Sequence, residues 1–117
     1  LMLDMDNLKY TNDTYGHEEG DKLIKLAANI LIRNQLDQSD IIRTDGTEFL
    51  IYLVGYDERQ VVSYIKKLTK ELKNMPYDFG ASIGHSMIDS DKKLVEDALN
   101  EAVEDMKIKK QENSLKE

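Results

Sequence analysis

Residues 40–54 of the chain read DIIRTDGTEFLIYLV. Two runs rich in Ile, Phe, Tyr, Leu and Val, Asp40–Thr44 and Glu48–Val54, flank the pair Asp45-Gly46. Such residues favour β-strands, and Asp-Gly between two strand-like runs predicts a tight turn, because Gly accepts the positive φ that the turn needs. The stretch is therefore expected to form a β-hairpin.

Helices and strands alternate around this hairpin. Apolar residues recur at helical spacing in three segments, and two short runs have the composition of buried strands. In chain order the expected elements are a strand at Leu1–Met5, helices at Asn7–Tyr15 and Glu18–Gln35, the hairpin, a helix at Asp57–Asn74, a strand at Gly80–Met87 and a helix at Asp91–Gln111, followed by a charged end that is expected to fray. This order predicts an α+β sandwich with a mixed or antiparallel sheet.

The composition indicates one acidic domain. A chain of 117 residues has the size of a single domain, so residues 1–117 are treated as one unit. The formal net charge of -7 disfavours binding to DNA, RNA or anionic lipid, and no apolar run approaches the ~20 residues that span a bilayer. The absence of cysteine excludes disulfides and thiolate metal sites. A cytoplasmic location is therefore expected, with no contact to nucleic-acid polymers or membranes.

Two carboxylates end the first predicted strand. Asp4 and Asp6 flank Met5, and alternation along a strand places residues two apart on one side. Mg²⁺ binds through one or two such carboxylates together with waters or substrate phosphates. Solvated acids that cap the next helix explain the same pattern, so Asp-x-Asp alone leaves both interpretations open.

The segment that follows narrows the choice. Residues 4–21 read DMDNLKYTNDTYGHEEGD. This stretch resembles the opening motif of GGDEF domains, the diguanylate cyclase fold of bacterial cyclic di-GMP signalling, and departs from it only at Leu8, where the motif has Phe. The resemblance implies a nucleotidyl-cyclase-like, ferredoxin-like palm with a mostly antiparallel sheet flanked by helices. The chain opens on Leu1 inside a strand, so we expect a fragment that lacks the family's N-terminal helix and belongs to a longer protein with other domains.

The resemblance also implies roles for individual residues. A Mg²⁺ ion would be held by the Asp4 carboxylate and the Met5 carbonyl, and the nucleotide phosphates would be held by Asn7, Leu8 and Lys9. Asn12 and Asp21 would recognise guanine, because Asp accepts from the donors on its edge while Asn both donates and accepts. GTP is therefore the expected nucleotide. His17 is better explained as a residue of the first helical turn than as a catalytic group.

The hairpin carries the family's second motif in an altered form. The family has Arg-aromatic-Gly-Gly-Asp/Glu-Glu-Phe, and this chain has RTDGTEF at residues 43–49. Gly46 keeps the close approach to the nucleotide, whereas Asp45 adds a side chain there. Thr47 replaces the carboxylate that would bind metal and help activate the attacking hydroxyl, and it does neither well. Glu48 is the remaining weak catalytic candidate.

Other family positions are incomplete. The inhibitory Arg-x-x-Asp pattern is replaced by Leu36 and Ser39, and the C-terminal Lys and Arg that touch phosphate correspond to Lys110 and Ser114. Lys110 lies in a run of charges, so a solvated helix end explains it equally well. The leading hypothesis is a catalytically inactive, GTP-binding regulatory domain. An active diguanylate cyclase, working as a homodimer on two GTP molecules, and a purely structural dimerisation module remain the alternatives.

Overall fold

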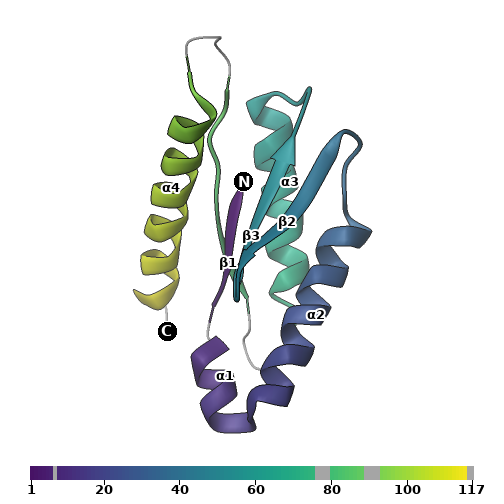
Figure 1. Ribbon diagram of the computed structural model, residues 1–117, viewed down its shortest axis with the longest axis vertical. Helices are drawn as coiled ribbons and strands as arrows, with labels where there is room; N and C mark the ends of the chain where they lie inside the picture. The colour runs from purple at the N-terminus through teal and green to yellow at the C-terminus, as the bar shows by residue number, and fades with distance from the viewer. Residues whose placement is uncertain (7, 76–79, 89–92, 116–117) are drawn as a thin grey trace.

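The core of the fold is a four-stranded antiparallel sheet (Figure 1). The computed structural model describes residues 1–6, 8–75, 80–88 and 93–115. Strands β1 (Met2–Met5), β2 (Ser39–Asp45), β3 (Glu48–Leu53) and β4 (Ala81–Gly84) lie side by side in the order β2-β3-β1-β4, and every neighbouring pair is antiparallel. This arrangement confirms the predicted α+β fold with an antiparallel sheet.

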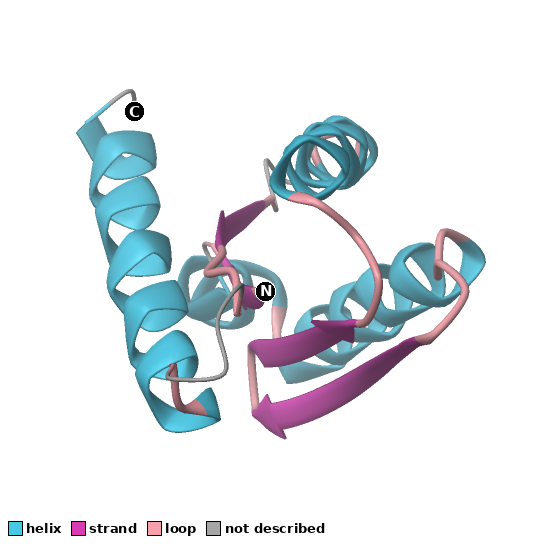
Figure 2. Cartoon of the chain, turned by 90° about the horizontal axis from the view of Figure 1, so that it is seen from above, coloured by secondary structure: helices cyan, strands magenta, loops and turns pink. Residues whose placement is uncertain are grey.

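The sheet is covered by helices on both faces (Figure 2). Helices α2 (His17–Arg33) and α3 (Glu58–Leu72) pack on one face, where Leu3 and Met5 of β1 join the main hydrophobic core. Helix α4 (Val95–Leu115) packs on the opposite face, where Met2 contacts a smaller apolar cluster. Because strand side chains alternate between faces, Asp4 points to the side of α4.

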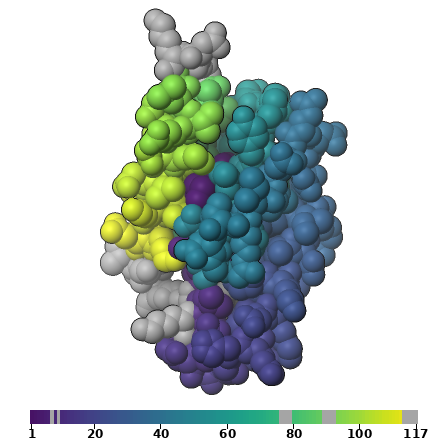
Figure 3. All heavy atoms as spheres, in the orientation of Figure 1, coloured from purple at the N-terminus to yellow at the C-terminus, as the bar shows by residue number. Residues whose placement is uncertain are grey.

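The N-terminal half of the candidate motif forms a short helix at one end of the sheet. Helix α1 (Leu8–Tyr15) follows β1 and packs against α2. In the space-filling view, α1 in purple lies at the lower end of the molecule, and the C-terminal turns of α4 in yellow lie higher, on its left side (Figure 3). Both helices lie near the end of β1 that carries the acidic residues.

The hairpin forms as predicted, but its turn differs from the prediction. Residues 46 and 47 make the turn, and no positive φ is found at either of them. Arg43 pairs with Phe49 and Asp45 with Glu48, which leaves an irregularity between Arg43 and Asp45. A bulge of this kind increases the local twist of a hairpin, so the strands close here with ordinary backbone angles. The expectation of a positive φ at Gly46 is therefore wrong.

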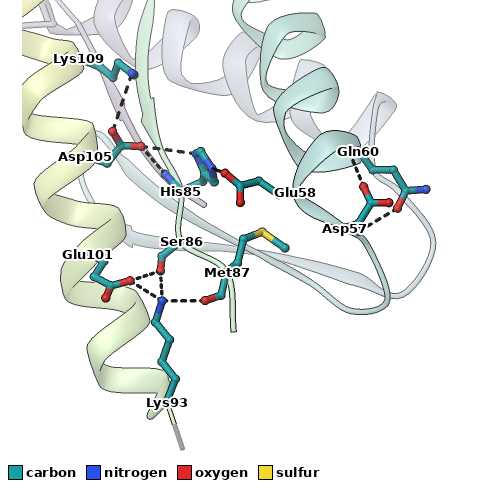
Figure 4. Close-up of polar contacts among 10 residues, drawn as sticks. All are labelled: Asp57, Glu58, Gln60, His85, Ser86, Met87, Lys93, Glu101, Asp105 and Lys109. Atoms are coloured by element: carbon teal, nitrogen blue, oxygen red, sulfur yellow. Dashed lines mark hydrogen bonds and ion pairs between the residues drawn. The ribbon is translucent and has the colours of Figure 1, made fainter. Parts of the chain in front are cut away.

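Strand β4 is shorter than predicted because α4 approaches it closely. A Cβ atom on Gly84 would lie 2.2 Å from both the Ala102 carbonyl oxygen and the Met106 amide nitrogen. Beyond Gly84 the chain leaves the sheet and bonds to side chains: the His85 amide donates to an Asp105 carboxylate oxygen at 3.0 Å (Figure 4). The predicted continuation of the strand to Met87 is therefore wrong.

The helices agree with the predicted segments apart from their ends. The N-cap Asp57 and Gln60 exchange hydrogen bonds in a capping box, which sets the start of α3. Helix α4 continues to Leu115, so the expected fraying from Lys107 onward is wrong as far as that residue. Within the described part of the chain, no helix is both long and apolar enough to cross a membrane.

Candidate functional site

An open pocket of about 560 Å³ lies where β1, α1, the hairpin and α4 meet. Such a volume falls within the range of small-molecule sites. The pocket is lined by Met5, Leu8, Tyr10, Asn12, Asp13, His17, Thr47 and Lys110. Four of the predicted site residues, from the start of the chain and from its last helix, therefore share one cavity, and His17 lies beside them as the first residue of α2.

Asp4 is held by two donors at the edge of this pocket. The Thr47 hydroxyl donates to its Oδ1 at 2.6 Å, and the Lys110 ammonium donates to its Oδ2 at 2.7 Å. The Asp4 side chain is 18% exposed, so these contacts are partly shielded from water. Both carboxylate oxygens therefore already accept a hydrogen bond from a protein group.

Asp6 belongs to the same cluster. The Ser82 hydroxyl of β4 donates to its Oδ1 at 3.0 Å, and the Lys110 ammonium lies 3.9 Å from that oxygen. Ser82 itself is buried. The Lys110 ammonium therefore lies between the carboxylates of Asp4 and Asp6. The hydroxyl groups of Thr47, in the turn between β2 and β3, and of Ser82, in β4, complete the cluster.

The residues in this arrangement do not fit a divalent metal ion. Mg²⁺ needs carboxylate oxygens free to coordinate it, but those of Asp4 are bonded to Thr47 and Lys110. Met5 is buried beside the pocket, and its amide donates to the Thr47 carbonyl. The Mg²⁺ predicted at Asp4 and Met5 would have to displace a bound ammonium group.

Asn12 presents an acceptor without a partner. Its side-chain oxygen is buried and has no hydrogen-bond partner among the residues that the structure describes. Buried polar atoms are nearly always bonded, so an orphaned oxygen in a pocket wall indicates a place for a ligand donor. Gly20 of α2 makes room for it, because a Cβ atom there would lie 1.8 Å from that oxygen.

The other residues predicted to bind the nucleotide differ in where they lie relative to the pocket. Leu8 begins α1 and lines the pocket, so the first turn of that helix opens on the cavity. The backbone of Lys9 lies in the same turn, and Asn7 lies outside the described residues. Asp21 is exposed on α2 and is absent from the described lining of the pocket. Asn12 thus lines the pocket while Asp21 lies on the surface of α2, and their joint recognition of guanine stays a prediction.

The hairpin residues bond mainly among themselves. Glu48 accepts from the Thr44 hydroxyl at 3.1 Å, although its Cα lies opposite that of Asp4 in the β1–β3 pairing. The Gly46 carbonyl accepts from the Arg43 guanidinium at 2.7 Å. Glu48 thus lies on the face of Asp4 with its carboxylate bonded to β2.

Three contributors to the site were not predicted from the sequence. Gly20 was part of the quoted motif, but no local signal showed that it makes room for Asn12. Ser82 stood out only as one of several small residues in a strand. Thr47 was recognised as a lost acid, whereas the structure shows that its hydroxyl bonds to Asp4.

Comparisons with known proteins agree with this geometry. A family model described as "Diguanylate cyclase, GGDEF domain" matches residues 1–115. The probable diguanylate cyclase DgcJ of Escherichia coli is 38% identical over 76 residues, which make up 64% of this chain and 15% of that protein. The bifunctional diguanylate cyclase/cyclic di-GMP phosphodiesterase MucR of Pseudomonas aeruginosa is 31% identical over 98 residues, or 78% of this chain and 14% of that protein. The chain therefore spans a small part of these relatives.

Solved structures show the same architecture. The active GGEEF domain of a diguanylate cyclase from Vibrio cholerae superposes with a TM-score of 0.87 at 20% identity, covering 95% of this chain and 74% of that one. A sensory box/GGDEF family protein from Caulobacter crescentus superposes with a TM-score of 0.79 at 27% identity, covering 95% of this chain and 76% of that one. The sheet order and the helices on its two faces are thus those of an established fold.

Proposed function

The chain belongs to the GGDEF domain family of cyclic di-GMP signalling, and we propose that it is a GTP-binding regulatory module rather than an active diguanylate cyclase. The single observation that carries this proposal is the orphaned side-chain oxygen of Asn12 in the wall of the pocket. A guanine base carries N–H donors on its edge, and one of them would satisfy this acceptor. Adenine has no donor at its N1 and C2 positions, so an acceptor that faces this edge of the base favours GTP over ATP.

Two features of the pocket would attract the phosphates of a bound nucleotide, namely the N-terminal end of α1 and the Lys110 ammonium. The first turn of α1 opens on the cavity at Leu8, and the N-terminal end of a helix favours anions. The Lys110 ammonium lies in the wall contributed by α4. These groups support nucleotide binding in spite of the acidic net charge of the chain.

The hairpin supports the loss of catalysis. Thr47 stands where the family signature has an acid, and its hydroxyl donates to Asp4 instead of accepting a proton. Glu48, the remaining candidate, bonds to Thr44. Loss of a general base lowers a rate by roughly 10²–10⁴. A domain that binds GTP without converting it would act on other domains of a longer protein, in the cytoplasm, alone or as a homodimer.

Calorimetric titration of the domain with GTP and with ATP tests this function, with cyclic di-GMP formation assayed on the same samples. We expect GTP binding that exceeds ATP binding by at least about tenfold, because a lost hydrogen bond in a buried pocket costs 1 kcal/mol or more. Asn12→Ala should lower the GTP affinity, whereas Asn29→Ala, an exposed position on α2, is the matched control. Product formation by the wild type would contradict the inactive assignment, and absence of GTP binding would contradict the binding assignment.

A further inference from the structure

We infer that Lys110 is the resident cation of the acidic site, so that this chain excludes a divalent metal and binds its nucleotide without one. The nucleotide part of this inference rests on the proposed function, but the metal part stands on contacts within the chain. Those contacts are the bonds that Lys110, Thr47 and Ser82 make to Asp4 and Asp6.

The first argument is the occupancy of Asp4. An ammonium at 2.7 Å from Oδ2 and a hydroxyl at 2.6 Å from Oδ1 occupy one acceptor site on each oxygen, so a metal ion that binds Asp4 must compete with both donors. Lys110 also lies 3.9 Å from Asp6, so its charge is shared by the two acids, as a metal ion between them would share its charge.

The second argument is the balance of charge. Asp4 and Asp6 supply two negative charges and Lys110 supplies one positive charge, while Thr47 is neutral. A divalent ion that approaches Asp4 and Asp6 would therefore meet an ammonium group that already pairs with both carboxylates. The side chains of Asp4 and Asp6 are 18% and 14% exposed and that of Lys110 is 42% exposed, so water screens only part of the repulsion between the ammonium and a metal ion.

The third argument separates Lys110 from the other lysines of α4. Lys107 pairs with Glu104 one turn away, and Lys109 pairs with Asp105, both on the helix surface and at 3.5 Å and 3.9 Å. Lys110 instead reaches a strand 106 residues earlier in the sequence, at the shortest distance of these pairs. Its contact is therefore part of the tertiary structure, whereas those of its neighbours are ordinary helix pairs.

The ammonium is also placed to take over the metal's task toward phosphate. Lys110 lines the pocket, and its ammonium has three N–H donors. Bonding to Asp4 leaves donors for a phosphate oxygen, so one group can neutralise the acids and contact the nucleotide. This geometry lets a guanine nucleotide bind without a metal ion.

Titration with Mn²⁺ alone, followed by electron paramagnetic resonance, tests the metal part without any nucleotide. We expect the wild type to bind Mn²⁺ at least about tenfold more weakly than Lys110→Met, because removal of a like charge next to a cation is worth more than one factor of ten. Lys109→Met removes the same charge one residue away and should behave as the wild type. Should Lys110→Met not fold, Lys110→Gln provides the same comparison. Equal Mn²⁺ affinity of the wild type and the Lys110 variant, weak or strong, would overturn the inference.

Titration with GTP in EDTA and in Mg²⁺ tests the nucleotide part. Equal affinity in the two buffers supports the inference, and Lys110→Met should then bind GTP more weakly in EDTA than in Mg²⁺. Binding of GTP only with Mg²⁺ would overturn the inference and leave the proposed function intact. Absence of GTP binding in both buffers would overturn the proposed function and the nucleotide part together, while the Mn²⁺ comparison would still decide the role of Lys110.

Discussion

The Cα of Gly20 lies so close to the side chain of Asn12 that a Cβ atom at position 20 would stand 1.8 Å from the Asn12 Oδ1. The two residues come from neighbouring helices, α1 and α2, and Gly20 is buried. The orphaned oxygen can therefore keep its place in the pocket wall only while position 20 has no side chain. A single glycine thus controls the group on which nucleotide recognition is proposed to depend.

Gly20→Ala should separate nucleotide binding from stability. The methyl group would force Asn12 out of its position, so we expect GTP affinity to fall about as far as in Asn12→Ala. Alanine favours a helix interior over glycine by about 1 kcal/mol, so the free energy of unfolding should change little or increase. Calorimetry and chemical denaturation check the two expectations. Gly80→Ala, with open space around its Cα, is the control. Unchanged GTP affinity in Gly20→Ala would contradict the role assigned to the contact.

Gly84→Ala should destabilise the whole fold. Its new Cβ would meet backbone atoms of α4 at 2.2 Å, and backbone cannot rotate away as a side chain can. Overpacking of this kind costs about 1–3 kcal/mol or more, so the midpoint of urea unfolding should fall clearly. Gly80→Ala again is the matched control. A midpoint equal to that of the wild type would show that α4 can shift away from β4 at no cost.

Thr47→Val should show how much the hydrogen bond from the Thr47 hydroxyl to Asp4 contributes to the free energy of unfolding. Valine has nearly the shape of threonine, but it cannot donate the hydrogen bond that Asp4 accepts from Thr47, whereas the bond from Lys110 to Asp4 stays. A hydrogen bond to a charged group contributes about 1.5–3 kcal/mol, and partial exposure lowers that figure, so we expect a loss of about 1 kcal/mol in the free energy of unfolding. Thr14→Val, exposed on α1, is the control in a urea titration. An equal loss of unfolding free energy in Thr47→Val and Thr14→Val would mean that the valine side chain, and not the lost hydrogen bond to Asp4, causes the loss.

The contacts at the start of α4 should weaken in acid (Figure 4). Hydrogen bonds from Lys93 and from the Ser86 hydroxyl hold the pKa of Glu101 below its ordinary value of 4.5. A carboxyl whose folded pKa is lowered contributes stability above its unfolded pKa and loses it as the pH falls through the folded pKa. The difference in thermal unfolding between the wild type and Glu101→Gln should therefore be present at neutral pH and shrink as the pH falls below 4.5. A difference that stays constant over this range would contradict the assignment.

Local sequence determined the elements and part of the site. Short runs of apolar, β-branched and aromatic residues predicted the strands, helical spacing predicted the helices, and Asp-Gly predicted the hairpin between β2 and β3. The stretch from Asp4 to Asp21 indicated the family, and Thr47 indicated the missing acid. These signals depend on residues that are near one another in the chain, so they can be recognised without knowledge of the fold. The exact turn and the end of β4 were misjudged, because a bulge and the approach of α4 set them.

Only the tertiary structure decided which side chains meet. The run at the end of α4 contains Lys107, Lys109 and Lys110, and all three suit a solvated helix end, so only the family resemblance singled out Lys110. The order β2-β3-β1-β4 brings Thr47 and Ser82 to either side of Asp4 and Asp6, and the packing of α4 turns only Lys110 of these lysines toward them. A charge pair across 106 residues follows from the closure of the sheet and the direction of the last helix. No local sequence pattern encodes the closure of the sheet or the direction of α4, and both determine what the site can bind.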